Sequence, residues 1–206
     1  MKIVGIVGGV ASGKSTVAEM FREHGASVIS ADEIGHHVLR DPEIIQRVAK
    51  RWGSNVINSS GEIDRQQLAM AVFPDDGNRD ALDFLEQLTH PYIKNFVLAE
   101  IDRLRASETE VVLLDAALLL ESGWNSMCQN IVFVDATAEV REKYAALRQW
   151  TKQELFRRES HQHSLEAKRS AADIVICNNG SLDSLRKEIS SAWDSIRGPE
   201  MGDCDS

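Results

Sequence analysis

The feature that most constrains this chain is a phosphate-binding loop placed directly after an apolar run near its start. Residues 8–15 read Gly-Gly-Val-Ala-Ser-Gly-Lys-Ser, which matches the pattern G-x-x-x-x-G-K-[ST]. The apolar residues 3–7 predict a buried strand, and the apolar spacing after the loop predicts a helix from about Lys14 to a stop at Gly25. Because strand, loop and helix come in the required order, a glycine-rich turn without a ligand is the weaker interpretation.

The residue types of the loop indicate how it would hold a phosphate group. Gly8 and Gly13 let the backbone curl so that successive N–H groups point at phosphate oxygens. Lys14 would reach the β- and γ-phosphates, the hydroxyl of Ser15 would be a ligand for Mg²⁺, and the helix N-terminus faces the same anion. The expected cradle comprises Gly8, Gly9, Ala11, Ser12, Gly13, Lys14, Ser15 and Thr16.

The rest of the chain alternates short apolar runs with helical patterns. Further strands are expected at residues 28–30, 111–115, 131–135 and 174–176. This alternation indicates an α/β fold with a parallel five-stranded sheet and helices on both faces. We expect the second strand to lie beside the first. A long helical region from Asp80 to about Ser107 is expected to be interrupted at His90-Pro91.

The length of 206 residues suits a single domain with insertions. The sheet core is expected to take residues 1–32, 108–140 and 171–197. Residues 33–107 are too many for a simple crossover, so they predict a helical substrate-binding insertion. The basic stretch at about 141–170 is a candidate lid, and the tail 198–206 is expected to be disordered.

Composition excludes some classes of partner. The net charge of −9 argues against nucleic acid as the main partner. No run of about 18 apolar residues exists, so no membrane span is expected. The cysteines, Cys128, Cys177 and Cys204, form neither a C-x-x-C pair nor a metal pattern, which favours a reduced, cytoplasmic protein. The sequence leaves open whether the protein is a monomer or a small homo-oligomer.

Two carboxylates follow predicted strands, and ligands of such sheets bind at the carboxyl ends of the strands. Asp32 follows the second strand and is a candidate base for the proton of a phosphoryl acceptor; the alternative is a helix N-cap. Asp115 ends the third strand and is a candidate Mg²⁺ ligand; the alternative is a solvated strand end.

A phosphate loop alone does not separate switches, motors and kinases. The chain lacks an N-K-x-D element for guanine, and its small size with one insertion suits a small-molecule kinase. Arg148 and Arg158 lie in the basic stretch and are candidates for closing over the phosphates, because a guanidinium binds a phosphoryl group bidentately. The alternative for them is a solvated helix face.

Several segments together resemble the dephospho-CoA kinase family, from Ile3 to about Leu185. They are residues 8–16, 28–32, 61–65, 88–93, 118–123 and 172–181, together with Arg158 and Gln162, which fit a lid pattern R-x-x-x-Q. The resemblance implies a P-loop kinase-like fold. It also implies ATP-dependent phosphorylation of the ribose 3′-hydroxyl of dephospho-CoA, the last step of coenzyme A synthesis.

The resemblance also implies roles for single residues. Asp32 matches the proposed base, Arg148 belongs to the catalytic lid, and Asn178 to Gly180 match the loop along the adenine of ATP. On the acceptor side the resemblance places Arg65, His90, Leu118 and Glu121. The helical insertion would then be the CoA-binding subdomain.

The sequence departs from the family pattern in three places. Ser30 stands where the family has the first acid of D-A-D, Ala117 replaces a proline, and the turn after Arg148 is one residue short. These departures leave two alternatives: a kinase of another small alcohol, and an inactive nucleotide-binding regulatory module.

Overall fold

The computed structural model describes residues 1–73 and 79–198 of the chain. Its strands are β1 (Lys2–Gly8), β2 (Ser27–Ser30), β3 (Val111–Asp115), β4 (Asn130–Asp135) and β5 (Ile174–Cys177). Its helices are α1 (Lys14–Glu23), α2 (Ala31–Val38), α3 (Pro42–Trp52), α4 (Arg65–Val72), α5 (Asp80–Ala106), α6 (Ala138–Leu147), α7 (Lys152–Glu159), α8 (Leu165–Ser170) and α9 (Leu182–Arg197), with short 3₁₀ turns η1 (Ser54–Val56) and η2 (Trp124–Met127). Apart from Gly198, the tail that was expected to be disordered lies outside the described residues.

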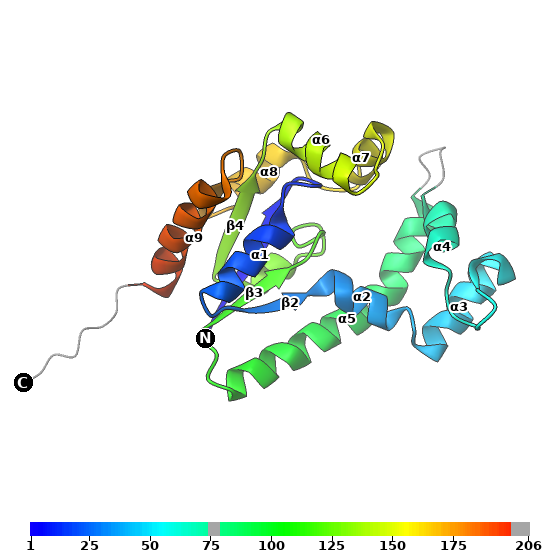
Figure 1. The fold of residues 1–206 in the computed structure, drawn as a ribbon. Helices are drawn as coiled ribbons and strands as arrows, with labels where there is room; N and C mark the ends of the chain where they lie inside the picture. The colour runs from blue at the N-terminus through cyan, green and yellow to red at the C-terminus, as the bar shows by residue number, and fades with distance from the viewer. Residues whose placement is uncertain (74–78, 199–206) are drawn as a thin grey trace, which may run out of the picture. The chain divides into compact units, whose positions relative to one another are not determined.

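The strands form one parallel sheet in the order β2-β3-β1-β4-β5 (Figure 1). The predicted α/β fold with a five-stranded parallel sheet is therefore confirmed. The strands read as apolar runs because their middle residues are buried, as strands covered on both faces require. β1 is central, so the loop that follows it starts from the middle of the sheet.

The expected neighbour of β2 is wrong. β2 pairs with β3, and β3 lies between β2 and β1. The crossover through α1 therefore carries the chain past one strand position, which β3 fills later. A right-handed crossover fixes the handedness of such a connection but not how many positions it spans.

One face of the sheet packs against α1 and α9. Alternate strand residues such as Val4 and Ile6 point to this face, where they meet Phe21 of α1 and Trp193 of α9. The rings of Phe21 and Trp193 lie 6.4 Å apart, tilted by 50°. This core fixes the direction of α1, and with it the position of the helix N-terminus that follows the loop.

The chain forms two compact units. The first comprises Met1–Ser30 and the chain from Asp102 onward, and it contains the sheet, α1 and α6–α9. The second, Ala31–Ile101, contains α2–α4 and most of α5. In the second unit Trp52 and Phe84 meet edge to face, with ring centroids 5.4 Å apart.

The expected interruption of the long helix at His90-Pro91 is also wrong. α5 runs continuously over 27 residues with Pro91 inside it. Pro91 removes one backbone hydrogen bond, but buried residues on both sides, Leu88 and Val97, hold the helix in place. The propensity of proline to break helices is here overridden by packing.

Gly5 of β1 leaves no room for a side chain. A Cβ atom at Gly5 would lie 2.5 Å from Cδ2 of Leu119 and 3.0 Å from Sγ of Cys128. We expect Gly5→Ala to lower the free energy of unfolding by about 1–3 kcal/mol, because the central strand and the turn after β3 would have to separate. Urea denaturation measures this change.

Gly35→Ala is the matched control. Gly35 lies within α2, and a Cβ atom there would meet Cδ1 of Ile93 at 3.5 Å, an ordinary contact. We expect this variant to be more stable than the parent by about 0.5–1 kcal/mol, since alanine favours helices. Equal effects of the two substitutions would contradict the packing assigned to Gly5.

Candidate active site

The two glycines that are expected to let the phosphate loop curl, Gly8 and Gly13, contribute in different ways. Gly13 is left-handed, with φ 91°, and so is Ala11, with φ 59°. Gly8, the last residue of β1, is needed for close approach: a Cβ atom there would lie 2.7 Å from Oγ of Ser12 and 2.8 Å from the carbonyl oxygen of Val134. The sequence pattern contains no signal for the strain at Ala11.

The helix end that follows the loop is open for an anion. The N-cap residue of α1 is Gly13, which has no side chain to bond the first N–H groups of the helix, and the first turn contains no acidic residue. The hydroxyl of Ser12 is buried and has no hydrogen-bond partner in the described part of the chain. Nζ of Lys14 lies 3.4 Å from the carbonyl oxygen of Gly9. Open backbone donors, a hydroxyl and an ammonium fit a phosphate group.

Asn178 supports the loop from the segment after β5. Its Nδ2 donates to the carbonyl oxygen of Ser12 over 2.8 Å, and its backbone N–H donates to the carbonyl oxygen of Asp135 over 2.7 Å. Asn178 is 5% exposed, so this hydrogen bond is shielded from water. Its side chain is thus used for holding the loop, whereas Gly180 lies in the exposed turn before α9.

The segment α6–α8 packs over the loop. Val10 and Ala11 share a small buried cluster with Ala145 of α6 and Leu155 of α7. A Cβ atom at Gly9 would lie 2.9 Å from Cδ of Arg141 and 3.0 Å from Cδ2 of Leu165. The basic stretch that is predicted as a lid therefore contacts the loop through apolar side chains and through the side chain of Arg141.

Both candidate lid arginines lie against one tryptophan. The guanidinium carbon of Arg158 is 4.1 Å from the ring centroid of Trp150, and that of Arg148 is 5.2 Å from it. Arg158 also pairs with Glu154 at 2.9 Å. These cation–π contacts hold both guanidinium groups against the same indole ring of the lid segment.

The strand-end carboxylates occupy different positions. Asp115, the last residue of β3, is half-buried and pairs in register with Ile6 of β1 and Ser30 of β2. Asp32 is exposed and is the second residue of α2, directly after β2. Because Asp32 lies inside the helix, it is not the N-cap residue of α2.

Arg65, a predicted acceptor-side residue, is paired within the second unit. Nη2 of Arg65 lies 2.7 Å from Nε2 of His36. Partial burial, followed by the charge of Arg65, lowers the pKa of His36, while Asp32 raises it. His36 was not selected from the sequence, although it lies one helical turn after Asp32. His90 is a half-buried residue of α5.

Glu121 and Leu118 lie in the turn after β3. Oε1 of Glu121 accepts a hydrogen bond from the backbone N–H of His163 over 2.5 Å and lies 3.9 Å from Nζ of Lys168. Lys168 is a buried cation beside the loop, and its sequence context does not predict this. A lysine in a short polar helix resembles a surface residue, and no spacing rule distinguishes it.

A magnesium site would need oxygen atoms from the ligand. Among residues 1–73 and 79–198, no group of three or more His, Cys, Asp or Glu side chains is placed to hold a metal ion. Ser15 and Asp115 carry hard oxygen atoms of the kind that Mg²⁺ binds, and Mg²⁺ commonly takes its other ligands from phosphates and water. The residues present fit that arrangement.

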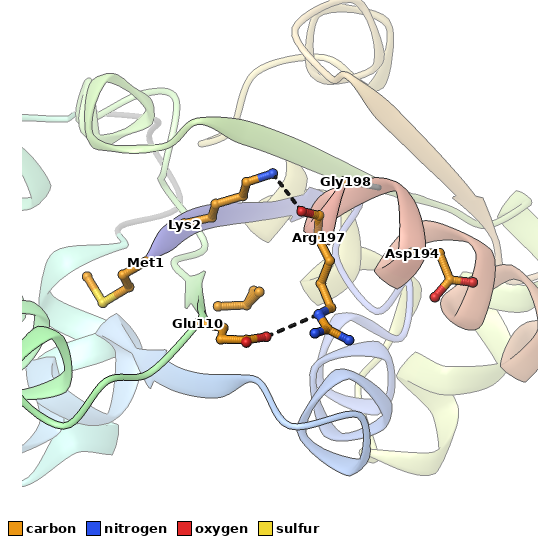
Figure 2. Close-up of a pocket in the computed structure, with 7 residues that line it drawn as sticks. Met1, Lys2, Glu110, Asp194, Arg197 and Gly198 are labelled. Atoms are coloured by element: carbon orange, nitrogen blue, oxygen red, sulfur yellow. Dashed lines mark hydrogen bonds and ion pairs between the residues drawn. The ribbon is translucent and has the colours of Figure 1, made fainter. Parts of the chain in front are cut away.

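A pocket of about 530 Å³ lies at the amino ends of the strands, at the end of the sheet opposite to the phosphate loop (Figure 2). Its lining includes Lys2 and Val111, at the amino ends of β1 and β3. Arg197 pairs with Glu110 at 3.1 Å, and Nζ of Lys2 donates to the carbonyl oxygen of Arg197 over 3.2 Å. The loop lies at the carboxyl edge of the strands, so this pocket is not part of the phosphate site.

The central parallel strand, the phosphate loop and the overlying helical segment define a P-loop kinase fold. The sequence matches the dephospho-CoA kinase family model over residues 2–184. The chain therefore belongs to the dephospho-CoA kinase family.

Individual relatives agree with this family. The chain is 37% identical to a dephospho-CoA kinase of Symbiobacterium thermophilum, over 98% of this chain and 84% of the relative. It is 37% identical to one of Arabidopsis thaliana, over 97% and 85%. A solved structure of a Thermus thermophilus protein is similar with a TM-score of 0.80 at 30% identity, covering 96% of this chain and 98% of that one.

Within the described part of the chain, none of the helices combines the length and apolar character that crossing a membrane would need.

Gly13 offers a direct test of the loop. A Cβ atom there would be strained at φ 91° and would strike Nδ2 of Asn178. We expect Gly13→Ala to weaken binding of a nucleoside triphosphate by about tenfold or more, since the loop can keep neither its shape nor its hydrogen bond to Asn178. Isothermal titration calorimetry measures the affinity.

Gly61→Ala is the matched control, because Gly61 has φ 80° but open space around it. We expect it to lose about 1–2 kcal/mol of stability from the same backbone strain and to bind nucleotide normally. If both variants bind nucleotide equally well, the role assigned to Gly13 is wrong.

Proposed function

We propose that the protein transfers the γ-phosphoryl group of ATP to the ribose 3′-hydroxyl of dephospho-CoA. The observation that carries the proposal is the uncapped N-terminus of α1 behind a complete phosphate loop, in a chain of the dephospho-CoA kinase family. The free thiols of Cys128 and Cys177 agree with a reduced, cytoplasmic setting, which is part of the same proposal.

The loop would hold the triphosphate with residues Gly8–Thr16. Backbone N–H groups at the start of α1 would donate to the phosphate oxygens, and Lys14 would turn from the Gly9 carbonyl oxygen toward the β- and γ-phosphates. Asn178 holds the loop in shape, and the exposed turn to Gly180 is the proposed adenine side. Ser15 and Asp115 are the proposed Mg²⁺ ligands. When bound, the ion would neutralise charge on the transferred group.

Asp32 is the proposed base. Its carboxylate is exposed at the start of α2, so it is accessible to an acceptor hydroxyl. It follows Ser30 at the carboxyl end of β2, the edge at which ligands bind in parallel sheets. Arg65 and His90 are the proposed acceptor-binding residues, with His36 holding the Arg65 guanidinium by its hydrogen bond.

The lid arginines would supply charge to the phosphoryl group. Arg148 and Arg158 lie on one indole ring, so a small rotation of either side chain can release its guanidinium while Trp150 stays packed against the loop. A guanidinium contributes most when it pairs bidentately with the developing charge. Because Arg158 is also held by Glu154 at 2.9 Å, we propose that Arg148 makes the catalytic contact.

An inactive nucleotide-binding module is the second candidate, because Ser30 replaces an acid next to the proposed base. The replacement leaves Asp32 and Asp115 in place, and the register sets Ser30 beside Asp115. Two carboxylates thus remain at this edge of the sheet, which favours the active enzyme over the module.

The proposed reaction is tested by incubating the protein with ATP, Mg²⁺ and dephospho-CoA and detecting CoA by mass spectrometry. Adenosine, AMP and shikimate serve as control acceptors. We expect CoA alone to be formed, and chelation of Mg²⁺ to abolish its formation. Phosphorylation of a control acceptor would indicate a kinase of another alcohol, and ATP binding without any product would indicate the inactive module.

Asp32→Asn tests the base. We expect kcat to fall by about 10²–10⁴-fold with ATP affinity unchanged, because the amide cannot accept the acceptor's proton. Asp102→Asn is the control, since Asp102 is an exposed residue of α5 that pairs only with Arg105 in the hydrogen bonds described. A normal kcat in Asp32→Asn would exclude Asp32 as the base.

A further inference from the structure

Lys168 of α8 is a buried lysine to which the proposed function assigns no role. It is 2% exposed, although lysine is a residue type that rarely loses contact with water. Nζ of Lys168 donates to Oε1 of Gln162 over 2.6 Å and to the carbonyl oxygen of Gly8 over 3.3 Å. The carboxylate of Glu121 lies 3.9 Å away. Burying an ammonium is unfavourable unless such partners surround it.

The partners of Lys168 come from three separate segments. Gly8 is where β1 enters the phosphate loop, Glu121 lies in the turn after β3, and Gln162 lies between α7 and α8. Glu121 also accepts the backbone N–H of His163, which ties its turn to the α7–α8 connection a second time. One ammonium therefore joins the loop entrance to the segment that packs over the loop.

We propose that Lys168 is a positioning residue for the phosphate loop: by holding the Gly8 carbonyl oxygen, Glu121 and Gln162 together, it sets the loop in the shape that binds a triphosphate. This inference rests on the proposed use of ATP. In this role Lys168 acts through Gly8: by fixing the Gly8 carbonyl group, it directs the following N–H groups toward the ligand.

The electrostatics favour a role with an anion present. Burial lowers the pKa of Lys168 to about 8; Glu121 opposes the shift, and the nearby ammonium of Lys14 adds to it. Arg141, which lies against Gly9, forms its own ion pair with Glu159. A phosphate group in the loop would stabilise both ammonium groups at once, so Lys168 is most readily charged when the ligand is bound.

A role in stabilising the fold alone explains the cluster around Lys168 less well than a role in positioning the phosphate loop. Buried ion pairs contribute little net stability compared with apolar residues of similar size. Glu121 has a second oxygen, Oε2, that is buried without a hydrogen-bond partner in the described residues, so the cluster is not optimised for stability. Its location around the loop entrance points to a functional reason for keeping a charge there.

The test compares Lys168→Met, Lys168→Arg and the control Lys187→Met, which changes an exposed lysine of α9. ATP affinity is measured by calorimetry, and kcat and both KM values by the coenzyme A assay. In Lys168→Met we expect the Kd and KM for ATP to rise by about tenfold and the KM for dephospho-CoA to change less than about twofold. Lys168→Arg should recover most of the affinity, because a guanidinium keeps the charge and the donors.

The pH dependence separates positioning from packing. In the parent protein and in Lys187→Met, we expect ATP affinity to fall between about pH 7 and about pH 9, as Lys168 loses its proton in the unliganded state. Lys168→Arg should not show the part of this fall that comes from residue 168, since its guanidinium stays charged. Equal pH profiles in Lys168→Arg and the parent would overturn the proposal.

A second variant covers the case in which Lys168→Met does not fold. Gln162→Leu removes one partner of the ammonium and no charge, and we expect it to raise the Kd for ATP by about threefold in a protein that still folds. ATP affinity unchanged in both Gln162→Leu and a folded Lys168→Met would overturn the proposal. Because affinity is measured without the acceptor, a parent that binds ATP but forms no CoA would refute the proposed reaction and leave this test valid.

Discussion

The site depends on one constraint: an uncapped helix end must be presented at the middle of a buried sheet. β1 is paired on both sides and α1 is fixed by the core around Phe21, so the loop between them can neither shift nor relax. Gly13 at the N-cap offers no side-chain acceptor to the backbone donors at the start of α1, so a ligand or water can take that place. Asn178 and Lys168, on segments distant in sequence, keep this open end in shape.

The sequence was sufficient for those parts of the fold that follow from local patterns. The five strands and the loop could be predicted, because buried parallel strands and a glycine-rich phosphate loop have strong local signatures. The position of β2 could not, because nothing local says how many strand positions a crossover spans. The continuity of α5 through Pro91 could not either, because tertiary packing there outweighs propensity.

The residues of the candidate site also fall into those that the sequence predicts and those that it does not. Gly13 and Lys14 could be located because the loop motif names them. The close approach at Gly8 and the buried ammonium of Lys168 depend in part on residues more than a hundred positions away. The strain at Ala11 depends on its backbone angles, and none of the three features is visible in the local sequence pattern. The roles assigned to Asp32, Arg148 and the acceptor-side residues stay predictions until they are measured.

The left-handed conformation of Ala11 has a consequence for the entropy of ligand binding. Glycine would adopt this angle without strain, yet the chain keeps a methyl group there, which packs against Ala145 and Leu155. A loop with alanine at this position samples fewer conformations when it is empty, so less freedom remains to be lost when a ligand arrives. The strained conformation of Ala11 therefore helps to preorganise the loop for ligand binding.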